Sequence, residues 1–384
     1  MAGNKTIVII IALASLLMLL PVKSDSEVSK IKKECQGVTS REQCYAKAFE
    51  NLTKATDRDH AFETLRKLQK IDPEARGCHF IAHAISTAET QKDQSKWKEL
   101  MNTAPPDCSY GAAHGALEVY ASTFPDGKLP KSEIPNLCNN PDTNNCTHIL
   151  GHLILVLNEN DIPASLKDCR TLPHDNLGKF ECLTGVFMER ITALNLEVHG
   201  LATNEALNWV ARVPELEALC RKQSGVYSVA CWKEIVHAVL VKVNNNPQQL
   251  VDFCETAPGE EETRQCIDHA LGIIAASYHF QLDRMGPICE AKAKAADYKN
   301  RCYAQLVSAT ISTVPQQIPS AVRFCGRVDP AYQEGCFTMI GNSLYRAQPE
   351  YKTILASECR LAPKNLRAKC ERGGNTSVRF YAGN

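Results

Sequence analysis

Apolar residues recur at intervals of three and four positions through most of the chain, which is the spacing of amphipathic α-helices. The helix predicted to begin at Cys266 carries Ile267 and Leu271 on one face. A shorter helix of residues 247–254 precedes it, and a polar loop of residues 258–263 is expected between the two. The pattern therefore predicts an all-α chain built from pairs of helices joined by short polar loops.

The two-helix pattern repeats, and cysteines mark its period. In the C-terminal half, the first and second cysteines of successive pairs recur every 34 to 36 residues, a period typical of two-helix repeats. A disulfide between the end of one helix and the start of the next would close a loop of about a dozen residues and stabilise it by about 2–4 kcal/mol. A helical hairpin cannot bury its apolar stripe alone, so hairpins stack. We therefore predict disulfide-stapled helical hairpins stacked as an α-solenoid. The five pairs are Cys220/Cys231, Cys254/Cys266, Cys289/Cys302, Cys325/Cys336 and Cys359/Cys370.

The remaining cysteines extend this scheme to the N-terminal half. Three further local pairs are Cys35/Cys44, Cys138/Cys146 and Cys169/Cys182. Cys78 and Cys108 each begin a second helix, but the helix before each has no cysteine. Parity predicts a bridge between these two in adjacent repeats. The alternative is that both are thiolate ligands of a metal beside His79 and His83.

The N-terminus has the pattern of a targeting segment. Lys5 precedes an apolar run of residues 7–22, which small residues follow. The run is too short for a comfortable membrane span, so residues 1–24 are interpreted as a cleaved signal peptide. If the segment were retained, it would anchor the chain to a membrane. Residues 25–200 are expected to form N-terminal repeats with a histidine-rich block, and residues 201–384 C-terminal stapled repeats.

Charge and cysteine content restrict the compartment and the partners. The chain has 43 basic and 43 acidic residues, and loss of Lys5 and Lys23 with the leader would leave a formal charge of −2. This balance argues against nucleic acid or an anionic membrane surface as partner. Eighteen cysteines are typical of an oxidising compartment. We expect a secreted glycoprotein that meets a protein or another extracellular ligand, with no membrane insertion beyond the leader. The glycosylation sequons begin at Asn51, Asn145 and Asn375.

Histidines supply the sharpest chemical pattern. Five of the eleven fall in three segments that begin helices, namely His79, His83, His114, His148 and His152. When the last histidine of each segment is aligned, His79 and His148 share the slot four residues earlier, and Tyr110 fills it in the other segment. Residues four apart lie on one helix face, so each segment can direct two side chains at one place.

Two carboxylates lie close to this pattern. Glu118 follows one turn after His114, and Glu189 comes one position past the corresponding slot of a later repeat. Imidazole and carboxylate groups bind zinc, iron or copper. We predict a transition-metal site with His83, His114 and His152 as ligands. The residues expected to complete or orient the shell are His79, His148, Glu118 and Glu189.

The other histidines are interpreted as hydrogen-bonded or solvated groups, since a single histidine on a helix is more often structural than a ligand. His237 occupies the aligned slot of its repeat but has the same interpretation. The remaining members of this set are His60, His174, His199, His269 and His279.

The residues do not identify a reaction. The histidine pairs lack the glutamate of the H-E-x-x-H motif, and the chain has no phosphate-binding loop, no G-x-S-x-G motif and no C-x-x-C-H motif. Three functions remain open. The first is a binding protein with a His/Glu metal site. The second is a hydrolase that uses the same pocket, either metal-dependent or with a His/Glu acid–base pair. The third is a pure interaction scaffold, whose histidines would be scattered.

Four local motifs resemble those of known sequences. CHxxAH begins at Cys78, HGxxE at His114, CxHxxGH at Cys146 and GVFME at Gly185. Together they resemble a loosely defined group of exported Cys/His-rich helical-repeat proteins of unknown function. The resemblance covers residues 77–190 and implies no activity. The repeat length also resembles that of secreted Sel1-like repeats, but the wider cysteine spacing and the missing Ala/Gly helix signature argue against that family.

Overall fold

The computed structural model describes residues 26–105, 108, 111–123, 130, 132–138, 144–192, 209–344 and 349–374. Regular structure in these ranges is entirely helical, which confirms the all-α prediction. The predicted signal peptide, Tyr110, His199 and the sequon at Asn375 lie outside the described residues, as does the side chain of Asn145.

The helices are mostly of two to four turns. In chain order the α-helices are α2 (Ser26–Glu34), α3 (Arg41–Ala55), α4 (Arg58–Ile71), α5 (His79–Lys92), α6 (Trp97–Asn102), α7 (Gly111–Ser122), α8 (Ile134–Leu137), α9 (Asn144–Leu157), α10 (Ile162–Thr171), α11 (Asn176–Thr192), α12 (Trp209–Arg221), α13 (Val226–Glu234), α14 (Val236–Lys242), α15 (Pro247–Cys254), α16 (Glu260–Ser277), α17 (Leu282–Met285), α18 (Tyr298–Thr313), α19 (Ile318–Arg327), α20 (Pro330–Leu344), α21 (Pro349–Glu358) and α22 (Arg367–Arg372). Short 3₁₀ helices are η1 (Pro73–Arg76), η2 (Gln94–Lys96), η6 (Gly286–Glu290), η7 (Pro315–Gln317) and η8 (Cys359–Leu361).

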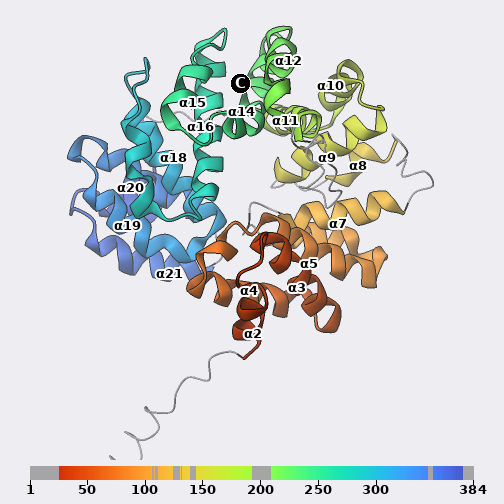
Figure 1. Ribbon diagram of the computed structural model, residues 1–384, viewed down its shortest axis with the longest axis horizontal. Helices are drawn as coiled ribbons and strands as arrows, with labels where there is room; N and C mark the ends of the chain where they lie inside the picture. Colours follow the sequence, from red (N-terminus) through yellow and green to blue (C-terminus); the bar gives the residue numbers. More distant parts are fainter. Residues whose placement is uncertain are drawn as a thin grey trace, which may run out of the picture.

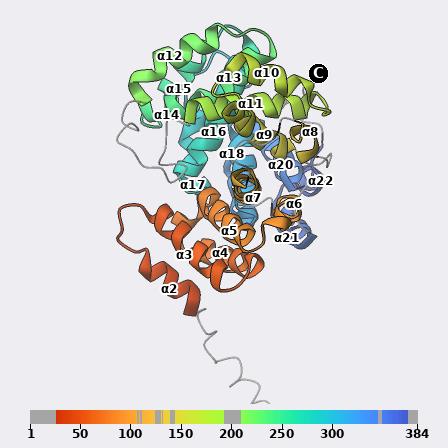
Figure 2. The ribbon, with the colours of Figure 1, turned by 90° about the vertical axis from the view of Figure 1, so that its right-hand side faces the viewer.

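Successive helices follow one another around the molecule in chain order (Figure 1). One series of neighbours runs through the whole chain, each helix packed against the next: α3, α5, α7, α9, α11, α13, α16, α18, α20 and α22. Figure 2 shows α2, α3 and α4 at one end of the molecule and α10 to α13 at the other. His279, after α16, lies 3.3 Å from Glu74 of η1, so the two halves of the chain also meet directly.

All eighteen cysteines are paired, and the nine bridges are the predicted ones. They are Cys35–Cys44, Cys78–Cys108, Cys138–Cys146, Cys169–Cys182, Cys220–Cys231, Cys254–Cys266, Cys289–Cys302, Cys325–Cys336 and Cys359–Cys370. Eight bridges join residues 8 to 13 positions apart, whereas Cys78 and Cys108 are 30 apart. Cys78 and Cys108 therefore carry no free thiolate, which excludes the alternative of a metal bound between them.

The apolar core follows the helix series. One buried cluster extends from Val28 to Ala112 and a larger one from Leu100 to Cys370. The domain boundary expected near residue 200 falls in residues 193–208, outside the described ranges, and stays a prediction. No helix in the described part of the chain is both long and apolar enough to span a membrane.

One predicted loop is wrong. Helix α16 begins at Glu260, six residues before Cys266, so most of the expected loop 258–263 is helical. Its first turn consists of Glu260, Glu261 and Glu262, whose negative charges interact favourably with the helix N-terminus. Helix α15 begins at Pro247, as predicted, and Asn246 accepts a hydrogen bond from the Gln249 amide at 3.0 Å.

Glycines allow neighbouring helices to approach until their backbones touch. A Cβ on Gly185 of α11 would overlap the carbonyl oxygen of His148 on α9, and one on Gly151 would overlap that of Cys182. Gly115 of α7 meets the carbonyl oxygen of His83 on α5 in the same way. These contacts bring the side chains beside each glycine within reach of the neighbouring helix.

We predict opposite effects for two helical Gly→Ala substitutions. Gly185→Ala should lower the free energy of unfolding by about 1–3 kcal/mol, because the methyl group would force α9 and α11 apart. Gly326→Ala, in α19, adds its methyl group to open space. It should leave the free energy of unfolding unchanged or raise it by up to about 1 kcal/mol. Urea unfolding with the disulfides intact measures both, and equal shifts would contradict the predicted helix contact.

Candidate metal centre and its imidazole row

Five imidazoles from α5, α7 and α9 lie in one row, which we call the imidazole row: His79, His83, His114, His148 and His152. The ring of His114 lies at its centre, with ring centroids 5.1 Å from His79, 6.4 Å from His83 and 5.5 Å from His152. The rings of His148 and His152 are 4.9 Å apart. The rings of His83, His114 and His152 thus lie together, as the alignment of the three segments predicts.

The two carboxylates near the row each meet one imidazole. Glu118 Oε2 lies 3.0 Å from His83 Nε2, and Glu189 Oε2 lies 2.8 Å from His152 Nδ1. They lie at different points of the row instead of closing one shell around a single ion. The predicted ligands are therefore spread along the row. We call these five imidazoles, with Glu118 and Glu189, the wall.

Burial keeps several of these imidazoles neutral. The pKa of His79 falls to about 4, because burial and the neighbouring His83 both disfavour its protonated form. The pKa values of His114 and His148 lie well below the ordinary value, through burial and then through the other imidazoles. His79 Nδ1 is 3.2 Å from the Cys108 carbonyl oxygen, to which its N–H donates. A neutral imidazole is the form that binds metals.

A path of hydrogen bonds and ion pairs leads from the row to a second cluster. His148 Nδ1 lies 2.8 Å from Thr184 Oγ1, and that hydroxyl is within donating distance of the Glu181 carbonyl oxygen at 2.8 Å. Lys233 Nζ lies 3.4 Å from Glu181 Oε2 and 3.6 Å from Glu234 Oε1. Polar contact is therefore continuous from α9 through α11 to α13.

The second cluster, which we call the Glu234 centre, consists of Glu234, His237 and His269. Glu234 ends α13, His237 lies in α14 and His269 in α16. The two Nε2 atoms are 3.2 Å apart, and they lie 3.4 Å (His237) and 3.3 Å (His269) from Glu234 Oε2. Within the described ranges, these are the three histidine, cysteine or acidic residues whose donor atoms lie close enough to share one ion.

These separations fit a tetrahedral metal shell. With metal–ligand bonds of about 2.0–2.1 Å, neighbouring ligands of a tetrahedral ion lie about 3.3–3.4 Å apart. The Glu234 side chain is 0% exposed, and neither carboxylate oxygen has a contact of hydrogen-bond geometry in the described part of the chain. A cation at the centre of the triangle would satisfy this buried carboxylate.

The charge states also suit metal binding. Burial raises the pKa of Glu234, but His269, His237 and Lys233 outweigh this effect and hold it well below its usual range. The carboxylate is therefore ionised. Burial lowers the pKa of His237, despite its contact with Glu234, so this imidazole is neutral near pH 7. An anionic carboxylate beside neutral imidazole is the ligand form of both groups.

The Glu234 centre adds to the sequence-based interpretation, which the 3.2 Å contact between His237 and His269 fits. Glu234 was not recognised as a candidate, and His237 and His269 were interpreted as ordinary hydrogen-bonded groups. Two sequence signals could have found the centre. Glu234 and His237 are three apart on consecutive turns, and His269 follows Cys266 by the same three residues that separate Glu234 from Cys231. Among the other histidines, His60 and His279 are partly exposed and pair with Glu27 and Glu74, as expected for solvated groups.

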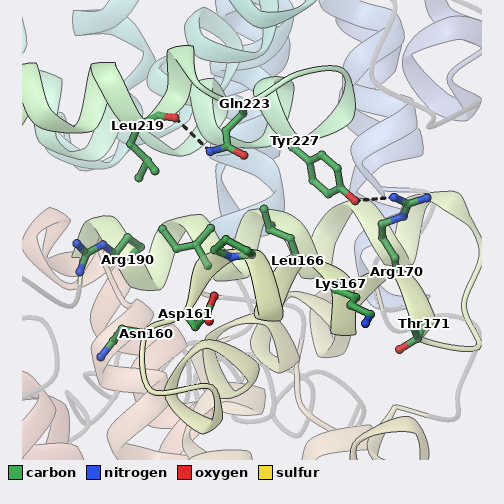
Figure 3. A pocket seen from close by; sticks show the side chains of 12 residues that line it. Asn160, Asp161, Leu166, Lys167, Arg170, Thr171, Arg190, Leu219, Gln223 and Tyr227 are labelled. Carbon is green, nitrogen blue, oxygen red and sulfur yellow. Dashed lines mark hydrogen bonds between the residues drawn. The ribbon is translucent and has the colours of Figure 1, made fainter.

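A separate groove of about 840 Å³ lies between α10 and the helices α12 and α13 (Figure 3). Arg170 donates to the Tyr227 hydroxyl across it at 3.0 Å. Lys167 and Arg190 add further positive charge, and Leu166 lies on its floor between them. None of its lining residues belongs to the imidazole row or the Glu234 centre.

Comparison of the chain with protein-family models, with curated proteins and with solved structures finds no match in any of the three. The site must therefore be interpreted from its own geometry.

The depressed pKa of His79 predicts a loss of stability in acid. The unfolded chain binds a proton at this imidazole near pH 6.5, whereas the folded chain binds it only near pH 4, so acidification across this window favours unfolding. His79→Gln keeps a donor for the Cys108 carbonyl but does not titrate. We expect it to lose about 1–3 kcal/mol less stability than the parent chain between pH 7 and pH 4. Urea unfolding in metal-free buffer tests this; equal losses would contradict it.

Proposed function

We propose that this chain is an exported helical-repeat protein that binds a divalent transition metal at Glu234, His237 and His269. The observation that carries the proposal is the near-equilateral triangle of donor atoms, with sides of 3.2, 3.3 and 3.4 Å. These separations match the edge length of a coordination tetrahedron, and a metal ion within the triangle would satisfy the fully buried carboxylate.

The donor set restricts the metal. Two imidazoles and one carboxylate suit zinc, iron or copper in the divalent state better than calcium or magnesium, which favour oxygen ligands. Lys233 Nζ lies 3.6 Å from Glu234 Oε1, the carboxylate oxygen outside the triangle, and can orient the carboxylate. The imidazole row, with Glu118 and Glu189, belongs to the same proposal as a wall of further ligands.

Export and architecture are part of the proposal. Nine disulfides fit an oxidising compartment, and the N-terminal sequence has the pattern of a signal peptide. The regular series of helix neighbours and the cysteine period favour stacking as an α-solenoid. Glycosylation and a protein or other extracellular ligand as partner accord with a secreted chain. The gathering of the imidazoles counts against a pure interaction scaffold.

We predict that the purified, chelator-treated chain binds one zinc ion per chain at the Glu234 centre. His237→Ala and His269→Ala should each weaken zinc binding at this centre by about 100-fold or more, because each removes one of three ligands. Isothermal titration with zinc measures the affinity and the stoichiometry.

The matched control for this titration is His60→Ala, because His60 lies partly exposed in α4, paired with Glu27. It should bind zinc as the parent chain does, and thiol titration should find no free cysteine in any variant. A sub-stoichiometric zinc content, or equal zinc binding by His237→Ala and His60→Ala, would refute the proposed centre.

A hydrolase is the second candidate function, favoured by the number of ligands. Catalytic zinc sites have three protein ligands and leave the fourth position for water, whereas structural sites use four. The Glu234 centre supplies three. A metal ion held there would lower the pKa of its bound water and so generate a nucleophile near neutral pH.

The hydrolase hypothesis predicts that the chain hydrolyses an activated aryl ester in a zinc-dependent reaction. The parent chain should lose this activity on chelation and regain it with zinc, and His269→Ala should lower it to background even with zinc present. Initial rates followed by release of the phenolate measure the effect. Hydrolysis that survives both chelation and His269→Ala would assign the activity elsewhere and leave metal binding as the sole function of the centre.

A further inference from the structure

We propose that His148, His152 and Met188 form a second metal site, selective for a soft monovalent ion, Cu(I). It goes beyond the Glu234 centre, with which it shares no residue, and it assigns a specific ion to two members of the imidazole row. The three side chains come from α9 and α11, which are packed together through Gly151 and Gly185.

Two donor atoms of this site lie close to the third, which is Nε2 of His148. His148 Nε2 lies 3.1 Å from His152 Nε2 and 3.4 Å from the sulfur of Met188. The two nitrogens are therefore close to the separation of about 3.3–3.4 Å that ligands of one ion have when its bonds are about 2.0–2.1 Å. Both histidine side chains are largely buried, with 17% and 12% exposed.

Hydrogen bonds on the far side of each ring direct the lone pairs inward. Glu189 Oε2 lies 2.8 Å from His152 Nδ1, and because a carboxylate accepts, the proton of a neutral His152 is on Nδ1. Its Nε2 then presents a lone pair to His148. This arrangement, in which a carboxylate holds the outer nitrogen of an imidazole, is the usual support of a metal-binding histidine.

The hydrogen bonds of Thr184 depend on whether a proton or a cation lies between the rings of His148 and His152. If His148 Nε2 carries a proton toward His152, Thr184 must donate to His148 Nδ1 and give up its bond to Glu181. If a cation binds both Nε2 atoms, Thr184 accepts from His148 Nδ1 at 2.8 Å and keeps donating to the Glu181 carbonyl oxygen at 2.8 Å. The second arrangement replaces the hydrogen bond between the two rings with bonds to the cation and keeps the bond from Thr184 to the helix carbonyl, which is typical of threonine within a helix.

The sulfur of Met188 sets the choice of ion. A thioether is a soft ligand, which selects Cu(I) over zinc, whereas imidazole accepts both. The Glu234 centre has an anionic oxygen where this site has a neutral sulfur. The two sites therefore differ in chemistry, although the path through Thr184, Glu181 and Lys233 connects them.

The frame of the site is rigid. Cys146, two residues before His148, is bridged to Cys138, and Cys182 of α11 is bridged to Cys169. The backbones of the two helices touch at Gly151, which lies between His148 and His152, and at Gly185, which lies between Cys182 and Met188. Two rings held in this way need little reorganisation to bind an ion, which favours affinity.

Competition with a chromophoric Cu(I) chelator under argon, with ascorbate as reductant, tests the site. The experiment uses the full chain with its disulfides and, as background, His237→Ala, which removes the Glu234 centre. We expect one Cu(I) per chain in both. Met188→Leu should weaken Cu(I) binding by about tenfold or more, and His148→Ala by about 100-fold or more.

The matched control is Met339→Leu, at a buried methionine of α20. It should bind Cu(I) as the parent chain does, and X-ray absorption should find one sulfur neighbour of copper in Met339→Leu but none in Met188→Leu. Equal affinities of the two leucine variants, or copper without a sulfur neighbour in the parent chain, would overturn the Cu(I) site.

Zinc titration of Met188→Leu separates this inference from the proposed function. Unchanged zinc binding together with weakened Cu(I) binding supports two independent sites. If zinc binding fails in the parent chain while Cu(I) binding depends on Met188, the Glu234 centre is wrong and the Cu(I) site stands. If Cu(I) binding in the parent chain is lost with His237→Ala, copper binds at the Glu234 centre and the second site is refuted.

Discussion

The backbone contact between neighbouring helices of the series is the constraint on which the imidazole row and the proposed Cu(I) site depend. Where Gly185 meets His148, and where Gly115 meets His83, the missing side chain lets one helix lie directly on the carbonyl groups of the next. Imidazoles on adjacent helices then come within 5–6.5 Å of each other, as the ring distances of His114 show. A larger residue at the contact would separate the helices and leave the same histidines in separate surroundings.

Disulfides make the arrangement of neighbouring helices repeat along the chain. Each bridge other than Cys78–Cys108 holds the start of a second helix against the helix before it, so residues at a fixed distance after these cysteines come to comparable places in their repeats. Glu234 and His269, three residues after Cys231 and Cys266, come together by this rule. Chemistry can therefore be built across repeats from residues that are distant in sequence but equivalent in register.

Much of the scaffold was predictable from the sequence because it depends on local spacing. Helical periodicity and cysteine spacing predicted the helices and all nine bridges. The start of α16 was missed because three consecutive glutamates suggest a loop, although the same charges stabilise a helix N-terminus. The imidazole row could be predicted because its members align. The Glu234 centre was missed, because Glu234, His237 and His269 occupy three different helices, and the register of Glu234 and His269 after their cysteines becomes informative only with the packing of α13, α14 and α16.

The charges around the imidazoles are compatible with the metal binding proposed above. Four carboxylates, Glu118, Glu181, Glu189 and Glu234, meet imidazoles of the row or of the Glu234 centre, and Lys233 pairs with both Glu181 and Glu234. By contrast, the buried Asp268 is neutralised by the Arg301 guanidinium, as expected for a structural pair.

Positive charge beside the buried Glu234 carboxylate could come from protonated imidazoles or from a bound cation, in addition to Lys233. Burial opposes the first, because it lowers the pKa of the four imidazoles His79, His114, His148 and His237. A cation held by neutral imidazoles would supply this charge without protonating them, at a point where nitrogen and oxygen donors lie close together.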